Sequence, residues 1–213
     1  MEKVMLPKIG AIVKLSHIKQ SNLVNATIMR KILLLFVLLM AIISCNSLTP
    51  EEKEIKATLG KIVETGMFSF VQEGNSPIAY NEFRGRYRHI SLVYLEDGCR
   101  PCFPRYIEWQ TRMDTMDLNH DFTVLFIING MSFDGFLANL LESNPEYDLS
   151  KDRFHVIIDS EQQFLNANHD IPRQILDKSL LIDKENRVRL IGHPFASPQI
   201  AELFYRICNE AKN

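Results

Sequence analysis

The sequence predicts an α/β domain with a mixed central β-sheet that is flanked by helices on both faces. Two observations predict this class. Strand-like apolar segments alternate with helical segments along the chain, and the last two strand-like segments are separated only by a short polar turn. Parallel strands need a crossover connection, whereas strands joined by a tight turn are antiparallel. The order therefore predicts parallel strands first and an antiparallel edge last.

Five segments have the apolar and β-branched composition of strands. The segment 122–128 is almost continuously apolar, which suits a strand that is buried on both faces. The polar turn is Asp183-Lys184-Glu185-Asn186, whose residue types favour turns. We expect strands over 90–95, 122–128, 154–158, 179–182 and 188–191.

Apolar residues at helical spacing predict five helices. Ser132 is an N-cap with Asp134 in the following turn, and Ser197 is an N-cap with Pro198 at the first helical position. We expect helices over 51–65, 99–116, 132–143, 162–167 and 197–211. Residues 66–86 contain Gly74, Pro77 and Gly85, and there we expect loops and a short strand at most.

Large apolar side chains in these segments are expected in the core. Trp109, Phe122, Phe126 and Phe154 are assigned to it for their place in the predicted elements. Cys208 lies in an amphipathic stretch of the last helix, and we expect it to be buried and unreactive.

The N-terminal part of the chain has the pattern of an export signal. Arg30 and Lys31 precede an apolar run of 12 residues, 32–43, which is too short to span a bilayer and fits a signal-peptide core. The run ends at Ser44-Cys45, which resembles a bacterial lipobox. That resemblance implies cleavage before Cys45, a lipid on its thiol, and a membrane-anchored lipoprotein at the periplasm or cell surface.

The chain therefore divides into four parts. Residues 1–28 precede a complete signal and are interpreted as a non-native or disordered extension, and 29–44 are the lipoprotein signal peptide. Residues 45–65 form a tether and an N-terminal helix. Residues 66–213 form the main domain.

The net charge of residues 45–213 argues against nucleic acid as a partner. The whole chain has a net charge of −2, but residues 1–44 contain six Lys or Arg and one Glu, so residues 45–213 carry −7. A domain this acidic offers no basic stripe that could neutralise phosphates. We therefore expect no nucleic-acid partner.

The chemistry is expected at Cys99-Arg100-Pro101-Cys102. This CxxC motif lies where a predicted strand ends and a helix begins, behind an export signal, which is the setting of a dithiol–disulfide site. Unpaired N–H groups at a helix N-terminus favour a thiolate, and Arg100 adds positive charge. Cys99 is therefore the expected nucleophile and Cys102 the resolving cysteine, with Pro101 stiffening the loop.

At these residues the chain resembles the thioredoxin-like superfamily, in particular the membrane-anchored thiol–disulfide oxidoreductases of the TlpA-like kind. The resemblance covers about residues 88–211 and includes the CxxC motif, the segment 181–188, Gly192 and the terminal helix. It implies a thioredoxin fold and exchange of disulfides with exported client proteins. It also implies a membrane electron donor in the reducing direction, and no cofactor beyond the sulfurs.

Three positions depart from the pattern of that family. A cis-proline usually faces the cysteines at the position of Asp177, and the nearest candidate here is Pro172, five residues earlier. A buried acid six residues before the first cysteine is replaced by Val93, with Glu96 and Asp97 nearby. The usual aromatic residue before the first cysteine is Gly98.

Two other functions compete with disulfide exchange. The domain could be a redox-inert binding lipoprotein with a structural Cys99–Cys102 disulfide, or less favourably a copper carrier that adds His169 or His193 to the thiols. A structural zinc site needs four ligands, usually from two such pairs, and only one pair is present. We therefore expect no resident metal.

A further basic feature precedes the first strand. Arg84, Arg86 and Arg88 alternate along the chain, as on the solvated face of a strand. The alternative is a positive rim that steers acidic partners to Cys99.

Overall fold

The computed structural model describes residues 29–31, 33, 48–74, 76–112, 121–151 and 155–209. Chain contacts separate the unit 1–49 from the unit 50–213, and the sheet belongs to the second unit. Cys45 and most of the predicted signal peptide lie outside the described residues, as does Phe154. Among the residues described, no helix combines the length and apolar character needed to cross a bilayer.

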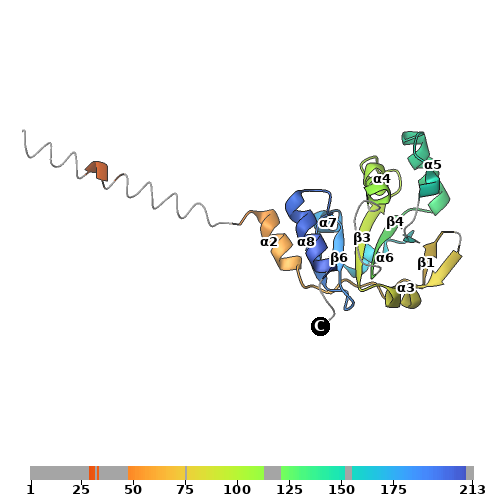
Figure 1. Ribbon diagram of the computed structural model, residues 1–213, viewed down its shortest axis with the longest axis horizontal. Coiled ribbons are helices and arrows are strands. Elements are labelled where there is room, and N and C mark those ends of the chain that lie inside the picture. Colours follow the sequence, from red (N-terminus) through yellow and green to blue (C-terminus); the bar gives the residue numbers. More distant parts are fainter. Residues whose placement is uncertain are drawn as a thin grey trace, which may run out of the picture. The chain divides into compact units, whose positions relative to one another are not determined.

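Unit 50–213 is built on one seven-stranded sheet with the order β2-β1-β5-β4-β3-β6-β7. Figure 1 shows this sheet between helices. The strands are β1 (Phe70–Glu73), β2 (Ser76–Ala79), β3 (His89–Glu96), β4 (Phe122–Asn129), β5 (His155–Ile158), β6 (Leu180–Ile182) and β7 (Val188–Ile191).

The strand directions confirm the predicted mixed sheet. β3, β4 and β5 are parallel, and β6 and β7 form an antiparallel edge on β3. At the β6–β7 turn, the Asp183 carboxylate accepts hydrogen bonds from the backbone N–H groups of Glu185 and Arg187. The arrangement β3-α4-β4 followed by β6-β7-α8, in which α4 is Cys102–Arg112 and α8 is Pro198–Cys208, is the thioredoxin fold that the resemblance implied.

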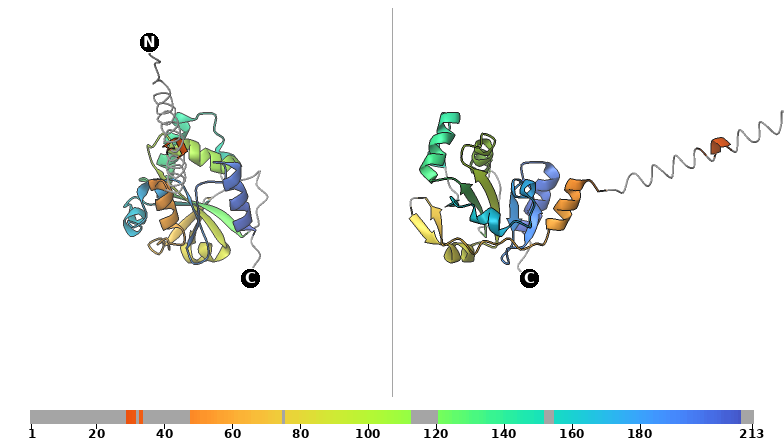
Figure 2. Two further views of the ribbon diagram at one scale, coloured as in Figure 1. Left: turned by 90° about the vertical axis from the view of Figure 1, so that its left-hand side faces the viewer. Right: turned by 180° about the vertical axis from the view of Figure 1, so that it is seen from behind.

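The helices form two layers that cover opposite faces of the sheet, as Figure 2 shows. Side chains alternate along β3, so that Leu92 and Tyr94 enter one buried cluster while Val93 and Leu95 enter the other. The first cluster is covered by α2 (Pro50–Thr58), α3 (Tyr80–Arg86), α6 (Gln163–Ala167) and α7 (Arg173–Leu176). The second is covered by α4 (Cys102–Arg112), α5 (Phe133–Ser143) and α8 (Pro198–Cys208).

The caps and core residues follow the sequence prediction. The Ser132 hydroxyl accepts a hydrogen bond from Gly135 N, and the Ser197 hydroxyl accepts one from Ile200 N. Trp109 and Phe126 are almost completely buried, and Phe122 packs against the same cluster. The predicted assignments of these elements and core residues are confirmed.

Two expected helix boundaries and the expected content of one segment are wrong. The first helix ends at Thr58 rather than 65, because Gly60 has a φ of +82° and the chain then runs along β7, with Val188 N donating to Lys61 O. The CxxC helix begins at Cys102 rather than at Cys99. Residues 66–86 hold the β1–β2 hairpin and α3, which are short and lack a clear period in the sequence.

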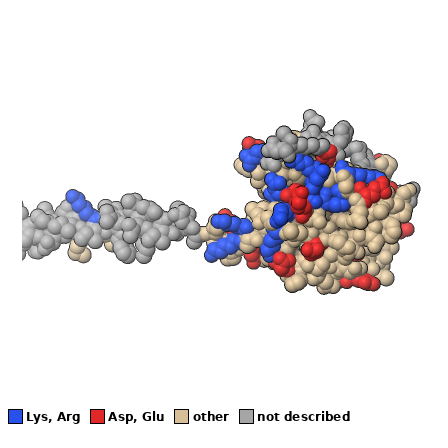
Figure 3. Space-filling model, turned by 90° about the horizontal axis from the view of Figure 1, so that it is seen from below, with Lys and Arg blue, Asp and Glu red and all other residues tan. Residues whose placement is uncertain are grey.

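The arginine series is not a strand face, nor is it a rim beside Cys99. Arg84 and Arg86 lie on α3, and Arg88 precedes β3 at the end of the strand away from the CxxC motif. Arg84 donates to the carbonyl oxygens of Asp183 and Tyr87, and Arg86 pairs with Glu73 and Glu82. Figure 3, which views the domain from the α3 side, shows basic and acidic side chains next to each other.

Candidate active site

The two cysteines of the motif form a disulfide at the carboxyl end of β3. Their Cα atoms are 5.3 Å apart. Gly98 turns the chain with a φ of +75°, a value that favours glycine, and Cys102 N donates to Cys99 O at 2.8 Å as α4 begins. Cys99 therefore lies in the turn that leads into the helix, and Cys102 is the first helical residue.

The two sulfurs have different surroundings. Cys99 is partly exposed and is followed by exposed Arg100 and Pro101. Cys102 is only 4% exposed and packs in the second buried cluster, which α4, α5 and α8 cover. The Cys102 sulfur accepts a hydrogen bond from the backbone N–H of Glu96 at 3.5 Å. Cys99 is thus the more exposed residue of the pair, while Cys102 lies inside the fold.

The loop before Cys99 is fixed to the neighbouring elements through Asp97. Its carboxylate accepts a hydrogen bond from Asn139 on α5 at 2.8 Å, and its backbone N–H donates to Asn129 O at 2.9 Å. Asp97 also packs closely against Gly130: a Cβ atom added to Gly130 would lie only 2.8 Å from the Cβ of Asp97. Beside this loop is a groove of about 620 Å³, whose lining includes Arg100, Phe103, Pro104, Asn139 and Ser143.

Arg105 occupies the open side of β3. The β3–β6 pairing spans only Ile90 to Leu92, so the strand continues beyond its neighbour. Arg105, one turn into α4, donates to both the Tyr94 carbonyl and the Asp177 carbonyl. It therefore joins the CxxC helix to the strand end and to the segment that precedes β6.

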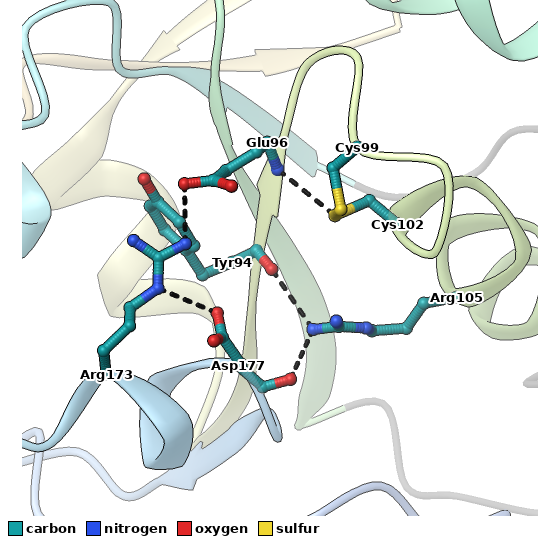
Figure 4. A network of polar contacts seen from close by, with 7 residues as sticks. All are labelled: Tyr94, Glu96, Cys99, Cys102, Arg105, Arg173 and Asp177. Carbon is teal, nitrogen blue, oxygen red and sulfur yellow. Dashed lines mark hydrogen bonds and ion pairs between the residues drawn. A yellow bond between two sulfur atoms is a disulfide. The ribbon is translucent and has the colours of Figure 1, made fainter.

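Arg173 forms a second connection on the same side, as Figure 4 shows. Its guanidinium pairs with Glu96 at 2.7 Å and with Asp177 at 2.9 Å, and it lies 4.6 Å from the centre of the Tyr94 ring. Burial raises the pKa of Tyr94 to about 12, and Arg173 opposes that shift. The phenol therefore remains neutral beneath the guanidinium at physiological pH.

The expected cis-proline is not found at this position. Pro172 precedes α7, and its carbonyl accepts hydrogen bonds from Ile175 N and Leu176 N. All peptide bonds are trans in the part of the chain that the structure describes. The residues of this segment that connect to the CxxC region are Arg173 and Asp177.

The sequence pointed to Glu96 and Asp97 but not to Arg173, which pairs with Glu96, to Asn139, which donates to Asp97, or to Arg105. Arg105 and Arg173 lie far apart in the chain, and only the packing of α4 and α7 along β3 brings them to one place. A signal for Arg105 existed, since it lies one turn after Cys102 in a helix that faces the sheet. Val93 lies six residues before Cys99, where the thioredoxin-like family often has a buried acid. It is fully buried in the second apolar cluster, which α4 covers.

The remaining candidates lie outside this arrangement. His169 contacts the Asn166 carbonyl, and His193 packs on Phe195, with its pKa lowered by burial. The described residues include no cluster of three His, Cys, Asp or Glu side chains that could hold a metal ion. Cys208 is buried, which raises the pKa of its thiol to about 12 and confirms the predicted burial.

Comparison with known proteins gives matches only among solved structures. No family model matches the chain, and no curated protein matches it. A thiol-disulfide oxidoreductase from Bacteroides fragilis is 13% identical over 67% of this chain and 99% of that one, with a TM-score of 0.47.

Two other solved structures are similar at the same level. The thioredoxin domain of a thiol-disulfide oxidoreductase from Bacteroides vulgatus is 10% identical over 71% and 98% of the two chains, with a TM-score of 0.44. A thioredoxin from Wuchereria bancrofti is 10% identical over 68% and 96%, with a TM-score of 0.43.

Proposed function

We propose that this chain catalyses thiol–disulfide exchange on exported proteins through Cys99 and Cys102. The observation that carries the proposal is the asymmetry of the pair, with Cys99 partly exposed and Cys102 buried. An exchange catalyst needs one sulfur that a client can reach and a second that is protected until the mixed disulfide has formed. A thioredoxin fold supplies this arrangement at the end of β3.

In the reducing direction the reduced pair acts on a client disulfide. The Cys99 thiolate attacks one client sulfur, and the other client sulfur leaves as a thiolate that takes up a proton. The Cys102 thiolate then attacks the Cys99 sulfur of the mixed disulfide. The client sulfur that was bound to Cys99 leaves as a thiolate, and the Cys99–Cys102 disulfide forms. The client gains two electrons and the pair loses two, so that a dithiol donor in the membrane must reduce Cys99–Cys102 for the next cycle.

In the oxidising direction the same steps run in reverse. A client thiolate attacks the Cys99 sulfur, Cys102 leaves as a thiolate, and a second client thiolate displaces Cys99. Arg100 follows Cys99 in the chain and Cys102 opens α4, and a neighbouring positive charge and a helix N-terminus both favour thiolate forms. The reduction potential of the pair decides which direction operates.

The proposed setting is the periplasm or cell surface. The basic pair Arg30-Lys31, the apolar run after it and Cys45 support export and a lipid anchor. Glu51, at the start of α2, belongs to the folded unit, which leaves only a few residues between Cys45 and the domain. The catalyst would then meet clients and its electron donor close to the membrane surface.

The first test traps the exchange intermediate. We expect Cys102→Ser to accumulate mixed disulfides with exported proteins, because the Cys99 linkage can no longer be resolved. The matched control, Cys99→Ser, should trap at least tenfold less, since Cys102 is buried. Non-reducing gels and mass spectrometry of the linked peptides provide the measurement, and equal trapping by the two variants would contradict the assignment of roles.

The second candidate is a binding module with a permanent disulfide. It is favoured by Val93, which leaves no acid buried below the sulfurs at that position. The reduction potential separates the two functions: a value of about −120 to −270 mV is that of catalytic pairs, and one below about −300 mV marks a structural disulfide. A value below that limit would replace exchange by the binding function.

A further inference from the structure

A closed chain of contacts begins and ends at the Cys102 sulfur. Glu96 N donates to this sulfur, and the Glu96 carboxylate is paired with Arg173. Arg173 is paired with Asp177, whose carbonyl accepts a hydrogen bond from Arg105. Arg105 belongs to α4, the helix that starts at Cys102, and the contacts therefore return to the sulfur. Figure 4 shows the whole set.

This chain of contacts replaces a missing strand neighbour. Beyond Leu92, the side of β3 that faces β6 has no ladder partner among the described residues, because β6 begins at Leu180 opposite Leu92. The Tyr94 carbonyl and the Glu96 N–H would otherwise open to solvent there. Arg105 satisfies the first, and the Cys102 sulfur accepts from the second.

We propose that Arg173 is a positioning residue which, through the Glu96 carboxylate, keeps the Glu96 N–H directed at the Cys102 sulfur and so stabilises the reduced pair. The inference rests on the proposed function and deepens it. Arg173 has no contact with either cysteine in the structure, and its action on the sulfur passes through Glu96.

The chemical effect comes from the different acceptor strength of the two redox states. A thiolate is a charged acceptor and gains more from an N–H donor than a disulfide sulfur does. A donor held in place therefore stabilises the reduced state more than the oxidised state, which makes the disulfide more oxidising. It also supplies Cys102 as a thiolate for the resolving step.

The exposure of the network makes it suitable for mutation. The side chains of Glu96, Arg173 and Asp177 are 42%, 40% and 44% exposed, and ion pairs this open contribute little to global stability. Loss of Arg173 should therefore leave the fold intact. The matched control is Arg189→Gln, which removes an arginine of similar exposure, 38%, that is paired with Asp183 on the β6–β7 edge.

The experiment measures the equilibrium of the full chain with glutathione at pH 7. Samples are quenched with acid and alkylated, and mass spectrometry gives the ratio of disulfide to dithiol in the Cys99–Cys102 peptide. We expect Arg173→Gln and Glu96→Gln each to shift the equilibrium about tenfold toward the disulfide. This corresponds to a reduction potential about 30 mV lower. The double variant should show the same shift as either single variant, because each substitution removes the same Arg173–Glu96 ion pair.

Glu96→Gln distinguishes positioning from simple charge. If only charge mattered, removing a carboxylate near the sulfurs would favour the thiolates and shift the equilibrium toward the dithiol, opposite to our expectation. A shift of that sign, or no shift in either variant, would overturn the proposal while leaving disulfide exchange intact. A wild-type disulfide that glutathione cannot reduce would overturn both. Arg189→Gln should leave the ratio unchanged.

Discussion

At the scale of single residues, Gly130 determines how closely the loop that carries Asp97 and Cys99 can approach the end of β4. It contributes no chemistry, but its missing Cβ leaves room for the Cβ of Asp97, two residues before Cys99. Asp97 is in turn fixed by Asn139. The position of Cys99 thus depends on Gly130, which follows β4 and lies far from Cys99 in the sequence.

Gly130→Ala is therefore expected to destabilise the domain. The new methyl group would overlap the Cβ of Asp97, and relief requires a shift of the loop that carries Cys99. We expect the free energy of unfolding, measured with urea, to fall by about 1–3 kcal/mol. Gly85→Ala is the control: it lies on α3 with no atom within 4 Å of the new Cβ, and should stabilise by up to about 1 kcal/mol. Equal effects at both glycines would show that Asp97 yields freely.

At the scale of elements, the junction between β1 and β5 depends on side chains. The two strands share a single registered pair, Gln72 with Val156. His155 strengthens the junction, because its two ring nitrogens lie 3.1 Å from Thr123 Oγ1 and from Glu73 Oε1. A neutral ring that accepts from the threonine and donates to the glutamate satisfies both contacts.

Burial lowers the pKa of His155 below its usual 6.5, although Glu73 opposes the shift. Below pH 6.5 the unfolded chain therefore binds more protons at this site than the folded chain, and stability falls as the pH falls. We expect His155→Gln to lose this part of the pH dependence. Urea unfolding between pH 7.5 and 5 gives the free energy of unfolding as a function of pH for both proteins. The same pH dependence in the variant and the wild type would show that His155 does not contribute to it.

At the scale of the whole molecule, the two helical layers close over a sheet whose central strands serve both faces. Leu125 and Ile127 belong to one cluster, and Val124, Phe126 and Ile128 belong to the other. The N-terminal helix α2 joins this body through the pairs Glu51–Lys178 and Glu54–Gln174, beside the segment that carries Arg173 and Asp177. Unit 50–213 therefore includes α2.

A chain that starts at Pro50 should keep the thermal stability of the full chain, because its contacts are internal to the unit. A chain that starts at Gly60 should melt at a lower temperature, since it loses α2, the packing of Ile55 and the pairs to Lys178 and Gln174. Thermal unfolding followed by circular dichroism compares the two. Equal melting temperatures would show that α2 is dispensable.

Much of this architecture could be predicted from the sequence, because it depends on local patterns. Strands with a long apolar run, such as 122–128, helices capped by Ser132 and Ser197, and the β6–β7 turn all have short-range causes. The CxxC motif between a strand and a helix predicted the position of the Cys99–Cys102 pair for the same reason. The β1–β2 hairpin and α3 were missed because four to seven residues are too few to show a period.

The sequence by itself determined the fold class, the central strands, the capped helices and the cysteine pair at the end of β3. Only the tertiary structure decided which groups support the end of β3 that holds the pair: Arg105 and Arg173, the Asp97–Asn139–Gly130 contact and the Glu96 N–H on Cys102. The physical reason is separation along the chain. A cap or an apolar period acts over a few residues, whereas Arg173 and Glu96 lie 77 residues apart and meet only after the sheet has formed.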